Sequence, residues 1–407
     1  MVLSGYSATF GFSKGGGMQP QEEMLEVKKQ KKQLSIGLPK ETAFYETRIC
    51  LVPEAAGLLH NHGHRIIVET EAGKSASFQD KDYSDVGAEI ALSKEDVFKA
   101  DMILKVNPPT IDEIKLLQPN HILLSALQLT VQPENFLRRL MDKKITAIAY
   151  DYIMDETGIF PVIRAMGEIA GTTSILIAAE YLSNANDGPG YMLGGIPGVF
   201  PAEVVILGAG TVAEFAAMAA LGLGATVKIF DNSIYKLARL QNLIGRRIYT
   251  SIIEPKLLKE TLRTADVAVG ALRAPFGRTP CVVSDDMVSC MKFGSVIVDV
   301  SIDQGGCFET SRVTNHASPV YKKYGVTHYC VPNIASRVSR TASYALSSIF
   351  APILLGIGEE GGLESMMRKN SGVRNSVYLY KGILTNKLLG ELFNLPYKDI
   401  NLLMAAI

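Results

Sequence analysis

The sequence has no excess of charge of either sign, because 41 lysine and arginine residues balance 41 aspartate and glutamate residues. A chain without net charge has no overall basic field to attract nucleic acid or an anionic membrane surface. We therefore expect no nucleic-acid partner and no membrane partner.

Cysteine is scarce and shows no pairing pattern. The five cysteines contain no C-x-x-C pair and stand at positions 50, 281, 290, 307 and 330. An odd number without such a pair argues against a disulfide framework and favours a reducing, cytosolic compartment.

The sequence shows no pattern typical of a secretory signal or of a membrane span. Residues 1–20 lack the basic start and the sustained apolar run of a secretory signal. The longest uncharged stretch, residues 342–358, contains Pro352 and falls short of the about 20 apolar residues of a membrane span. We expect this stretch to be a helix buried in protein, and the protein to be cytoplasmic.

What is present is material for a large packed core. The chain has 407 residues, of which 47% are hydrophobic, so two or three domains are expected. Residues 1–33 begin with a glycine run and continue with charged residues, which predicts a flexible tail. Beyond this tail, strand patterns alternate with helical patterns, which indicates βαβ units and mostly parallel sheets.

The expected elements fall into two blocks. In the first block we expect strands over 34–39, 64–70, 102–106, 121–127 and 146–153, and helices over 53–63, 82–90, 93–100 and 133–144. A long helix over 161–184 and a glycine- and proline-rich loop precede the second block. That block has expected strands over 203–207, 227–230, 265–272, 295–301 and 326–331, and the chain from about residue 340 is expected to be helical.

A glycine motif follows the first strand of the second block. Gly208, Gly210 and Ala213 have the spacing G-x-G-x-x-A between an apolar strand and a helix. This spacing is typical of a dinucleotide site, in which the pyrophosphate lies on the helix N-terminus. Asp231 follows Gly208 by 23 residues, where an acid binds the adenosine ribose and favours NAD over NADP. Lys236, five residues further on, weakens that preference, and a purely structural glycine turn is the alternative.

Charged residues follow strands at three further places. Arg48 lies past the first strand, Lys105 near the end of the strand over 102–106, and Asp303 after the strand over 295–301. Ligands of parallel sheets bind beyond the carboxyl ends of strands, and an arginine with a lysine can hold a carboxylate. The alternatives are a surface arginine at 48 and an Asx-turn at 303.

A histidine cluster, His60, His62 and His64, lies across a predicted helix end and the following turn. No nearby cysteine or carboxylate completes a ligand set, so we expect no metal site.

Five segments together resemble one enzyme family. They are IGLPKETAFYETRICLVPEAAG (36–57), ILKVNPP (103–109), LGGIPGVFPAEVVILGAGTVAEFAA (193–217), VDVSIDQGGCFE (298–309) and CVPNIASRVSRTASYAL (330–346). Over roughly residues 34–400 the chain resembles the alanine dehydrogenase family, which is related to the NAD-binding subunit of nicotinamide nucleotide transhydrogenase. The string IDQGGCFE favours the dehydrogenase branch.

The resemblance implies a fold and an activity. The fold is α/β, with two Rossmann-like domains, mostly parallel sheets and a cleft between them. A substrate domain is expected over 34–160 plus 340–407, and an NAD-binding domain over 161–339. The activity is reversible oxidative deamination of L-alanine to pyruvate and ammonia with NAD, in a homo-oligomer, often a hexamer.

The resemblance also implies roles for single residues. It assigns the substrate carboxylate to Arg48, a substrate contact to Lys105, acid–base catalysis to Asp303, the ribose to Asp231 and the nicotinamide side to Asn333.

The chain departs from the family pattern near the expected chemistry. Gln128 stands where the family has a catalytic histidine, and glutamine cannot titrate. Gly167 replaces a serine, while Arg337 and Arg340 enter a loop expected near the cofactor. Three alternatives therefore stay open: a transhydrogenase-like NAD oxidoreductase, a dehydrogenase of another amino acid, and a non-catalytic NAD-binding homologue.

Overall fold

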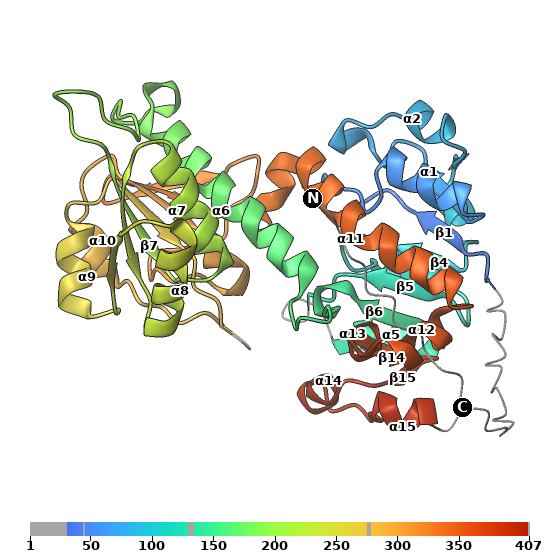
Figure 1. Ribbon diagram of the computed structural model, residues 1–407. Helices are drawn as coiled ribbons and strands as arrows, with labels where there is room; N and C mark the ends of the chain where they lie inside the picture. Colours follow the sequence, from blue (N-terminus) through green and yellow to red (C-terminus); the bar gives the residue numbers. More distant parts are fainter. Residues whose placement is uncertain (1–30, 44, 129–133, 275–277, 406–407) are drawn as a thin grey trace, which may run out of the picture.

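The computed structural model describes residues 31–405 apart from residue 44 and the segments 129–133 and 275–277. The predicted tail therefore lies almost wholly outside the described residues. Two β-sheets, each flanked by helices, lie side by side and are joined by long helices (Figure 1).

The first sheet has eight strands in the order β15-β14-β6-β5-β4-β1-β2-β3. Its strands are β1 (Ser35–Leu38), β2 (Arg65–Glu69), β3 (Glu89–Ala91), β4 (Met102–Leu104), β5 (Ile122–Ser125), β6 (Thr146–Ala149), β14 (Val377–Tyr380) and β15 (Ile383–Leu384). The helical elements of the same regions are α1 (Pro53–Asn61), η1 (Lys74–Ala76), α2 (Asp80–Ser84), α3 (Lys94–Val97), α4 (Ile111–Leu116), α5 (Glu134–Asp142), η3 (Tyr150–Tyr152), α11 (Ser339–Glu359), α12 (Leu363–Lys369), α13 (Ser371–Ser376), α14 (Lys387–Leu392) and α15 (Ile400–Ala405).

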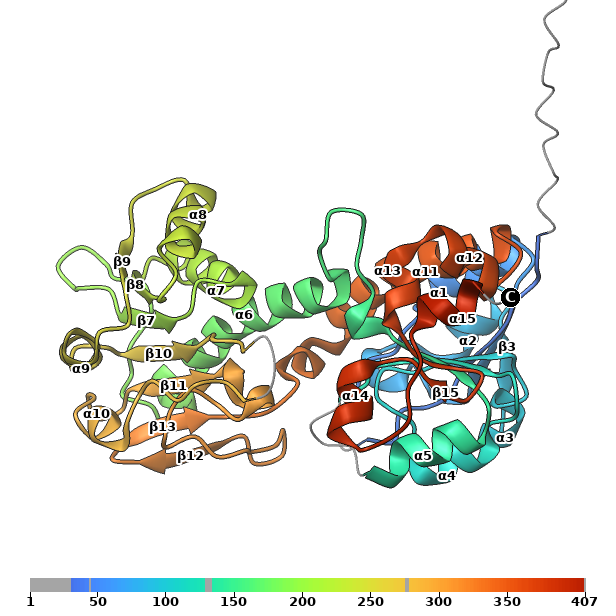
Figure 2. The same cartoon turned by 90° about the horizontal axis from the view of Figure 1, so that it is seen from below.

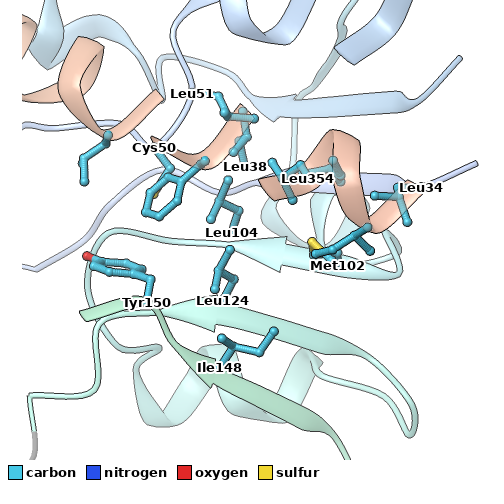
Figure 3. Packing of buried hydrophobic residues seen from close by; sticks show 14 of the residues in the cluster. Leu34, Leu38, Cys50, Leu51, Met102, Leu104, Leu124, Ile148, Tyr150 and Leu354 are labelled. Carbon is cyan, nitrogen blue, oxygen red and sulfur yellow. The ribbon is translucent and has the colours of Figure 1, made fainter. Parts of the chain in front are cut away.

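The central strands of this sheet are buried on both faces. Leu104 and Leu124 pack into a cluster with Leu354 of α11 on one face (Figure 3). Ile103 and Leu123, their neighbours along the strands, belong to a separate cluster on the other face. Two covered faces explain why these strands read as continuous apolar runs rather than as alternating patterns.

The second sheet has seven strands in the order β12-β13-β11-β10-β7-β8-β9. They are β7 (Glu203–Leu207), β8 (Thr226–Phe230), β9 (Tyr249–Ser251), β10 (Val267–Gly270), β11 (Val296–Asp299), β12 (Val320–Lys323) and β13 (Val326–Tyr329). Its helical elements are α6 (Pro161–Leu182), η4 (Asn184–Asn186), α7 (Thr211–Gly222), α8 (Ile234–Ile244), α9 (Pro255–Leu262), α10 (Asp285–Ser289), η5 (Val300–Gln304) and η6 (Ile334–Val338).

Strand pairing in this second sheet is parallel except between β12 and β13. The chain proceeds from β7 to β8 on one side, and β10 lies on the other side of β7. The order therefore reverses beside β7, which is the position where doubly wound sheets bind ligands. The architecture matches the expected fold class. The domain limits stay a prediction, although the strands of each sheet fall within the expected segments.

Two long helices connect the sheets. Helix α6 runs from the second sheet toward the first and also packs against α11 (Figure 2). It lies very close to α7, because a Cβ on Gly171 would lie 2.4 Å from the carbonyl oxygen of Val212. Pro161–Leu182 and Ile334–Glu359 are long and apolar enough to cross a membrane by length and composition. Both pack against neighbouring elements, and the core helices of soluble proteins pass the same test.

Two expectations about local structure are wrong. The helix expected over 82–90 ends at Ser84, because Gly87 adopts a φ of 92° and the chain turns into β3, which pairs with β2. The chain beyond residue 340 is not wholly helical, since β14 extends the first sheet through antiparallel pairing with β6, and β15 pairs antiparallel with β14. In both cases pairing with a distant strand decides the local structure, and a local pattern does not show such a partner.

Candidate active site

Four neighbouring parallel strands of the first sheet, β1, β4, β5 and β6, end on the same edge. Arg48 follows β1, Lys105 follows β4 and Gln128 follows β5. In the second sheet the segments after β7, β8, β11 and β13 carry the glycine motif, Asp231, Asp303 and Asn333. Seven predicted site residues lie within four positions of the carboxyl end of a strand, namely Lys105, Gln128, Gly208, Gly210, Asp231, Asp303 and Asn333. Arg48 lies further on, ten positions past the end of β1.

Glu46 is the centre of a hydrogen-bond network that joins the two sheets. Arg48 donates from Nε to Oε1 and from Nη2 to Oε2, both at 2.7 Å. Oε2 also accepts from Nδ2 of Asn107 at 2.9 Å and from Nδ2 of Asn333 at 2.7 Å. The Ser336 hydroxyl donates to Oε1 at 3.1 Å. Asn333 and Ser336 follow the second sheet, so this carboxylate fixes the two sheets' edges against each other.

The charge balance of this centre favours its ionised form. Burial acts to raise the pKa of Glu46, but the adjacent Arg48 guanidinium and its hydrogen bonds outweigh burial and hold that pKa below its usual range. Arg48 is buried too, and the Glu46 carboxylate keeps it charged. Sequence reasoning missed Glu46. The available signal was that a buried arginine requires a carboxylate partner, and Glu46 stands two positions away.

Lys105 is buried beneath the same edge. Its Nζ lies 3.3 Å from Oε2 of Glu41 and 3.3 Å from Oε1 of Glu113. Glu113 is held in turn by Lys94 at 2.8 Å. Burial acts to lower the pKa of Lys105, but these two carboxylates outweigh it and raise that pKa, so the ammonium stays charged. A charged lysine in this position can hold an anionic substrate group.

Gln128 contacts the network from the end of β5. Its Nε2 donates to Oδ1 of Asn107 at 2.8 Å, and Asn107 donates to Glu46. The residue adopts a left-handed φ of 44° and is exposed. Among the described residues, no hydrogen bond joins Gln128 to Asp303, so these two predicted catalytic positions meet only through the network.

Asp303 lies in η5, after β11. Its Oδ1 accepts the backbone N–H of Asn333 at 3.0 Å, and the Asn333 side chain donates to Glu46. Partial burial raises the pKa of Asp303, because it disfavours the charged carboxylate. The hydrogen bond from the Asn333 N–H and the charge of Arg48 act in the opposite direction. The side chain keeps contact with solvent. A carboxyl with a raised pKa and solvent access is suited to exchange protons.

Asn333 thus couples the predicted catalytic carboxylate, through Glu46, to the arginine predicted to bind the substrate. It adopts a left-handed φ of 56°, a conformation that asparagine tolerates better than most residues. Its backbone contacts Asp303 and its side chain contacts Glu46.

The glycine motif has the geometry of a dinucleotide site. Gly208 has a φ of 117°, and a Cβ there would lie 2.5 Å from the carbonyl oxygen of Ala271. Gly210 is the N-cap of α7, and a Cβ there would meet no atom within 4 Å. The helix N-terminus is therefore open at the point where a pyrophosphate binds. Ala213 is fully buried in α7, where only a small side chain fits between helix and strand.

Asp231 flanks that open helix end. Its Oδ2 accepts the N–H of Ala209 at 2.8 Å, and its Oδ1 accepts the N–H of Ser233 at 2.7 Å. A carboxylate has about four acceptor positions, so two remain for ribose hydroxyls. Lys236 lies exposed in the first turn of α8 and forms no ion pair with another described residue. These residues fit a dinucleotide cofactor.

The substituted positions differ in their surroundings. A Cβ on Gly167 would meet Thr211 of the glycine motif at 3.6 Å, so this position does face the cofactor loop. Arg337 is paired with Glu180 of α6, and Arg340 donates to the carbonyl oxygen of Ser77 at 2.7 Å. Both guanidiniums are thereby held by protein groups.

No group of three histidine, cysteine, aspartate or glutamate side chains within the described ranges is arranged to hold a metal ion.

Two family descriptions match the chain. "Alanine dehydrogenase/PNT, N-terminal domain" covers residues 37–170, and "Alanine dehydrogenase/PNT, C-terminal domain" covers residues 174–387. The chain belongs to the alanine dehydrogenase/PNT family. The split between the two descriptions falls inside α6, the helix that connects the sheets.

Similar proteins agree with this assignment. The chain is 37% identical to "Alanine dehydrogenase 2" of Staphylococcus aureus (strain USA300) over 368 residues, which is 90% of this chain and 98% of that protein. A solved L-alanine dehydrogenase superposes with a TM-score of 0.83 at 35% identity, covering 88% of this chain and 99% of that one. A transhydrogenase from Sinorhizobium meliloti shares the fold, with a TM-score of 0.74 at 22% identity over 87% of this chain and 99% of that one.

These findings confirm the predicted family, the fold class and an NAD-dependent amino-acid dehydrogenase that acts on a small-molecule substrate. The roles of the individual site residues stay predictions.

Proposed function

We propose that the protein catalyses reversible oxidative deamination of L-alanine to pyruvate and ammonia with NAD. The observation that carries this proposal is the position of Asn333, which contacts Asp303 through its backbone and Glu46 through its side chain. Through Glu46, Asn333 joins the proton-transferring carboxylate of one sheet to the carboxylate-binding Arg48 of the other.

The first task of the chain is to hold the substrate. Arg48 and Lys105 bind the carboxylate of alanine, with the guanidinium oriented by Glu46 and the ammonium kept charged by Glu41 and Glu113. NAD, when bound, supplies the acceptor for the hydride that leaves Cα. The ammonium group of alanine first loses a proton, and loss of the hydride from Cα then converts the neutral amine into an iminium ion.

The second task is proton transfer. Water adds to the iminium carbon and loses a proton to Asp303, giving a carbinolamine. The amine takes up a proton as the C–N bond breaks, and the hydroxyl loses one as the carbonyl of pyruvate forms. Asp303 serves both directions, because its raised pKa brings the carboxyl nearer to the working pH. Gln128 positions Asn107 by hydrogen bonding and transfers no proton.

The cofactor binds at the edge of the second sheet. Gly208 and Gly210 admit the pyrophosphate to the N-terminus of α7, Ala213 allows the close packing behind it, and the Asp231 carboxylate accepts the ribose hydroxyls. The same carboxylate repels a 2′-phosphate, so NAD is preferred over NADP despite the exposed Lys236. Asn333 lies on the nicotinamide side.

The separation of substrate binding from cofactor binding divides the chain into two domains. Residues 34–160 plus 340–407 form the substrate domain, and residues 161–339 form the NAD-binding domain.

The protein works as a homo-oligomer in the cytoplasm, and the segment between α6 and β7 forms the subunit contact. This segment projects from the second sheet (Figure 1), and its Phe200 side chain is 96% exposed. At its base lies a pocket of about 450 Å³ lined by Ala179, Tyr191 and Leu223, among others. An apolar projection beside an apolar pocket is self-complementary under twofold symmetry, as a contact between identical subunits requires.

The oligomer is tested by sedimentation of the Phe200→Asp variant. We expect a smaller species than the wild type. The control is Leu92→Asp on the first sheet, where Leu92 is 85% exposed. An unchanged species for Phe200→Asp would remove this surface as the contact.

The activity is tested by NADH formation in a screen of amino acids at alkaline pH. We expect L-alanine to give the highest kcat/KM and NADP to be a poor substitute for NAD. A screen without NADH formation from any amino acid contradicts the proposal.

One observation favours a second candidate, a transhydrogenase-like reaction. Gln128 cannot titrate, and direct hydride exchange between two dinucleotides needs no proton transfer. Reduction of an NAD analogue by NADH in the absence of any amino acid would support that candidate.

A further inference from the structure

The site edge contains a carboxylate without an assigned role. Asp151 lies in η3, directly after β6, and β6 is the neighbour of β5 in the first sheet. Its Oδ2 accepts the backbone N–H of Leu127 at 3.3 Å. Leu127 immediately precedes Gln128, whose side chain holds Asn107. Asp151 therefore supports the turn that presents Gln128 to the network.

The backbone around Asp151 is firmly held. The buried hydroxyl of Tyr150 donates to the carbonyl oxygen of Val106, and its ring packs against Phe350 of α11 with a centroid distance of 5.1 Å. Helices α6 and α13 also pack against η3. A carboxylate on such a support holds its hydrogen-bond partner in a fixed position.

Cations from both sheets face this carboxylate. Arg48, after β1, and Arg273, in the loop after β10, both act on Asp151, and both also act on Asp303. The two aspartates thus lie in one electrostatic field, one on each side of the junction between the sheets. Arg273 is exposed and forms no hydrogen bond or ion pair with another residue in the described part of the chain.

The remaining charged groups of the elements packed on η3 are already engaged. In α6, Arg164 pairs with Glu168 at 2.9 Å. In α13, Arg374 donates to the carbonyl oxygen of Met367 at 3.0 Å. Arg48 and Arg273 therefore favour the ionised form of Asp151, and they act against the larger effect of its burial.

We propose that Asp151 is a positioning residue of the dehydrogenase reaction, whose ionised carboxylate fixes the Leu127–Gln128 turn and thereby the Asn107–Glu46–Arg48 network. This inference rests on the proposed function and deepens it. It also supplies the site with a titrating group beside the position where the chain carries Gln128 in place of an imidazole.

The direction of the pH effect follows from the surroundings. Burial raises the pKa of Asp151 to about 6, against the opposing effects of the Leu127 N–H, Arg48 and Arg273. Above this pH the carboxylate is ionised and its hydrogen bond to the Leu127 N–H is charge-assisted. Below it the group becomes neutral, the hydrogen bond weakens and the turn loosens. Activity should therefore fall as the pH decreases through about 6.

The test is the pH profile of kcat and kcat/KM between pH 5 and 9 for reductive amination of pyruvate. Asp151→Asn keeps an oxygen acceptor but cannot ionise, so we expect an about tenfold lower kcat at pH 8 and a flattened acid limb. Asp151→Glu should restore most of the rate and retain an acid limb. Glu156→Gln, which removes an exposed carboxylate from the same loop, is the matched control and should follow the wild type.

Thermal unfolding of each variant separates positioning from loss of structure. The fraction of free ammonia changes with pH in the same way for every variant. The comparison therefore uses only the differences between the pH profile of each variant and that of the wild type. A kcat of Asp151→Asn that falls by the same factor at every pH, or an acid limb that it shares with the wild type, overturns the inference while leaving the proposed function intact. A wild type that turns over no amino acid or 2-oxo acid overturns both.

Discussion

The two sheet edges that form the candidate site are built in different ways. The edge of the second sheet relies on backbone: an open helix N-terminus at Gly210, a tight turn at Gly208 and one carboxylate at Asp231. The edge of the first sheet relies on buried charges that compensate each other, with Glu46 opposite Arg48 and two carboxylates opposite Lys105. The edge of the second sheet has the expected residue at each position of the G-x-G-x-x-A motif. The charge network of the first sheet contains Gln128 at the position where the family resemblance predicts a histidine.

This difference indicates where the chain tolerates change. A glycine turn is fixed by sterics, so each motif position allows few residues. A hydrogen-bond network requires that each buried donor and acceptor has a partner. The network therefore tolerates an amide at position 128, because the Gln128 side chain donates to Asn107. Substitutions at four positions test this comparison.

The largest effect is expected at the contact between the two edges. Asp303→Asn keeps an oxygen that accepts the Asn333 N–H but cannot take a proton, so kcat for alanine should fall by at least about 100-fold. NAD affinity and thermal stability should stay close to wild type, and both are measured alongside turnover. A variant with near-wild-type turnover would remove Asp303 from the chemistry.

The next largest effect is expected within the charge network. Arg48→Lys loses the two-point contact with Glu46 and leaves a buried carboxylate partly unpaired, which should cost about 1.5–3 kcal/mol, or about 10- to 100-fold in kcat/KM. Steady-state kinetics with alanine, and with pyruvate plus ammonia, measure the loss.

The matched control for Arg48→Lys is Arg65→Lys. Arg65 forms the same two-point contact with Glu89 at 2.7 Å, but on the surface, where such pairs contribute little. Michaelis constants of Arg48→Lys that stay unchanged in both directions would rule out its role in binding the carboxylate.

The sequence alone predicts a site residue only where its contacts follow from nearby positions in the chain. Arg48, Lys105 and Asp303 were found because each follows a strand, and parallel strands bring their ends together. For Glu46 the local signal was only its position two residues before Arg48, and its other partners Asn333 and Ser336 lie 287 and 290 positions away. No local pattern shows such a contact.

The same reasoning accounts for the errors in the fold. Strands β3 and β14 were expected to be helical, and each is stabilised by a strand that lies elsewhere in the sequence. The position of Arg337 and Arg340 in a loop near the cofactor stays a prediction, and the partners of their guanidiniums, Glu180 and the Ser77 carbonyl, could not be read from the local sequence. Local sequence gives an arginine's position along the chain and not the partner toward which its long side chain turns.

A smaller effect is expected at the backbone-dominated edge. Asp231→Ala removes charged hydrogen bonds to the ribose, worth about 1.5–3 kcal/mol. It also removes the acceptor of the Ala209 and Ser233 N–H groups, a loss that for NADP is offset by the removed repulsion of the 2′-phosphate. NAD should therefore bind about 10- to 100-fold more weakly, with little change for NADP. Fluorescence titration with NADH and NADPH measures both affinities. Lys236→Ala, which removes the neighbouring exposed cation, is the control and should not weaken NADH binding. Tighter binding of NADPH than of NADH by the wild type would contradict the assignment of Asp231.

The smallest effect is expected at Gln128, the position at which the charge network departs from its family. Gln128→Ala removes one neutral hydrogen bond to Asn107, so we expect a loss of about 2- to 10-fold in kcat/KM and no change in the shape of the pH profile. Gln128→His places a titrating ring at a residue with a φ of 44°, a conformation in which histidine is comparatively common. A ring that reaches the substrate would raise turnover and add an ionisation near the ordinary histidine pKa of about 6.5. A loss of more than about 100-fold for Gln128→Ala would show that the amide does more than position Asn107, and the contrast between a rigid backbone site and a tolerant charge network would then fail.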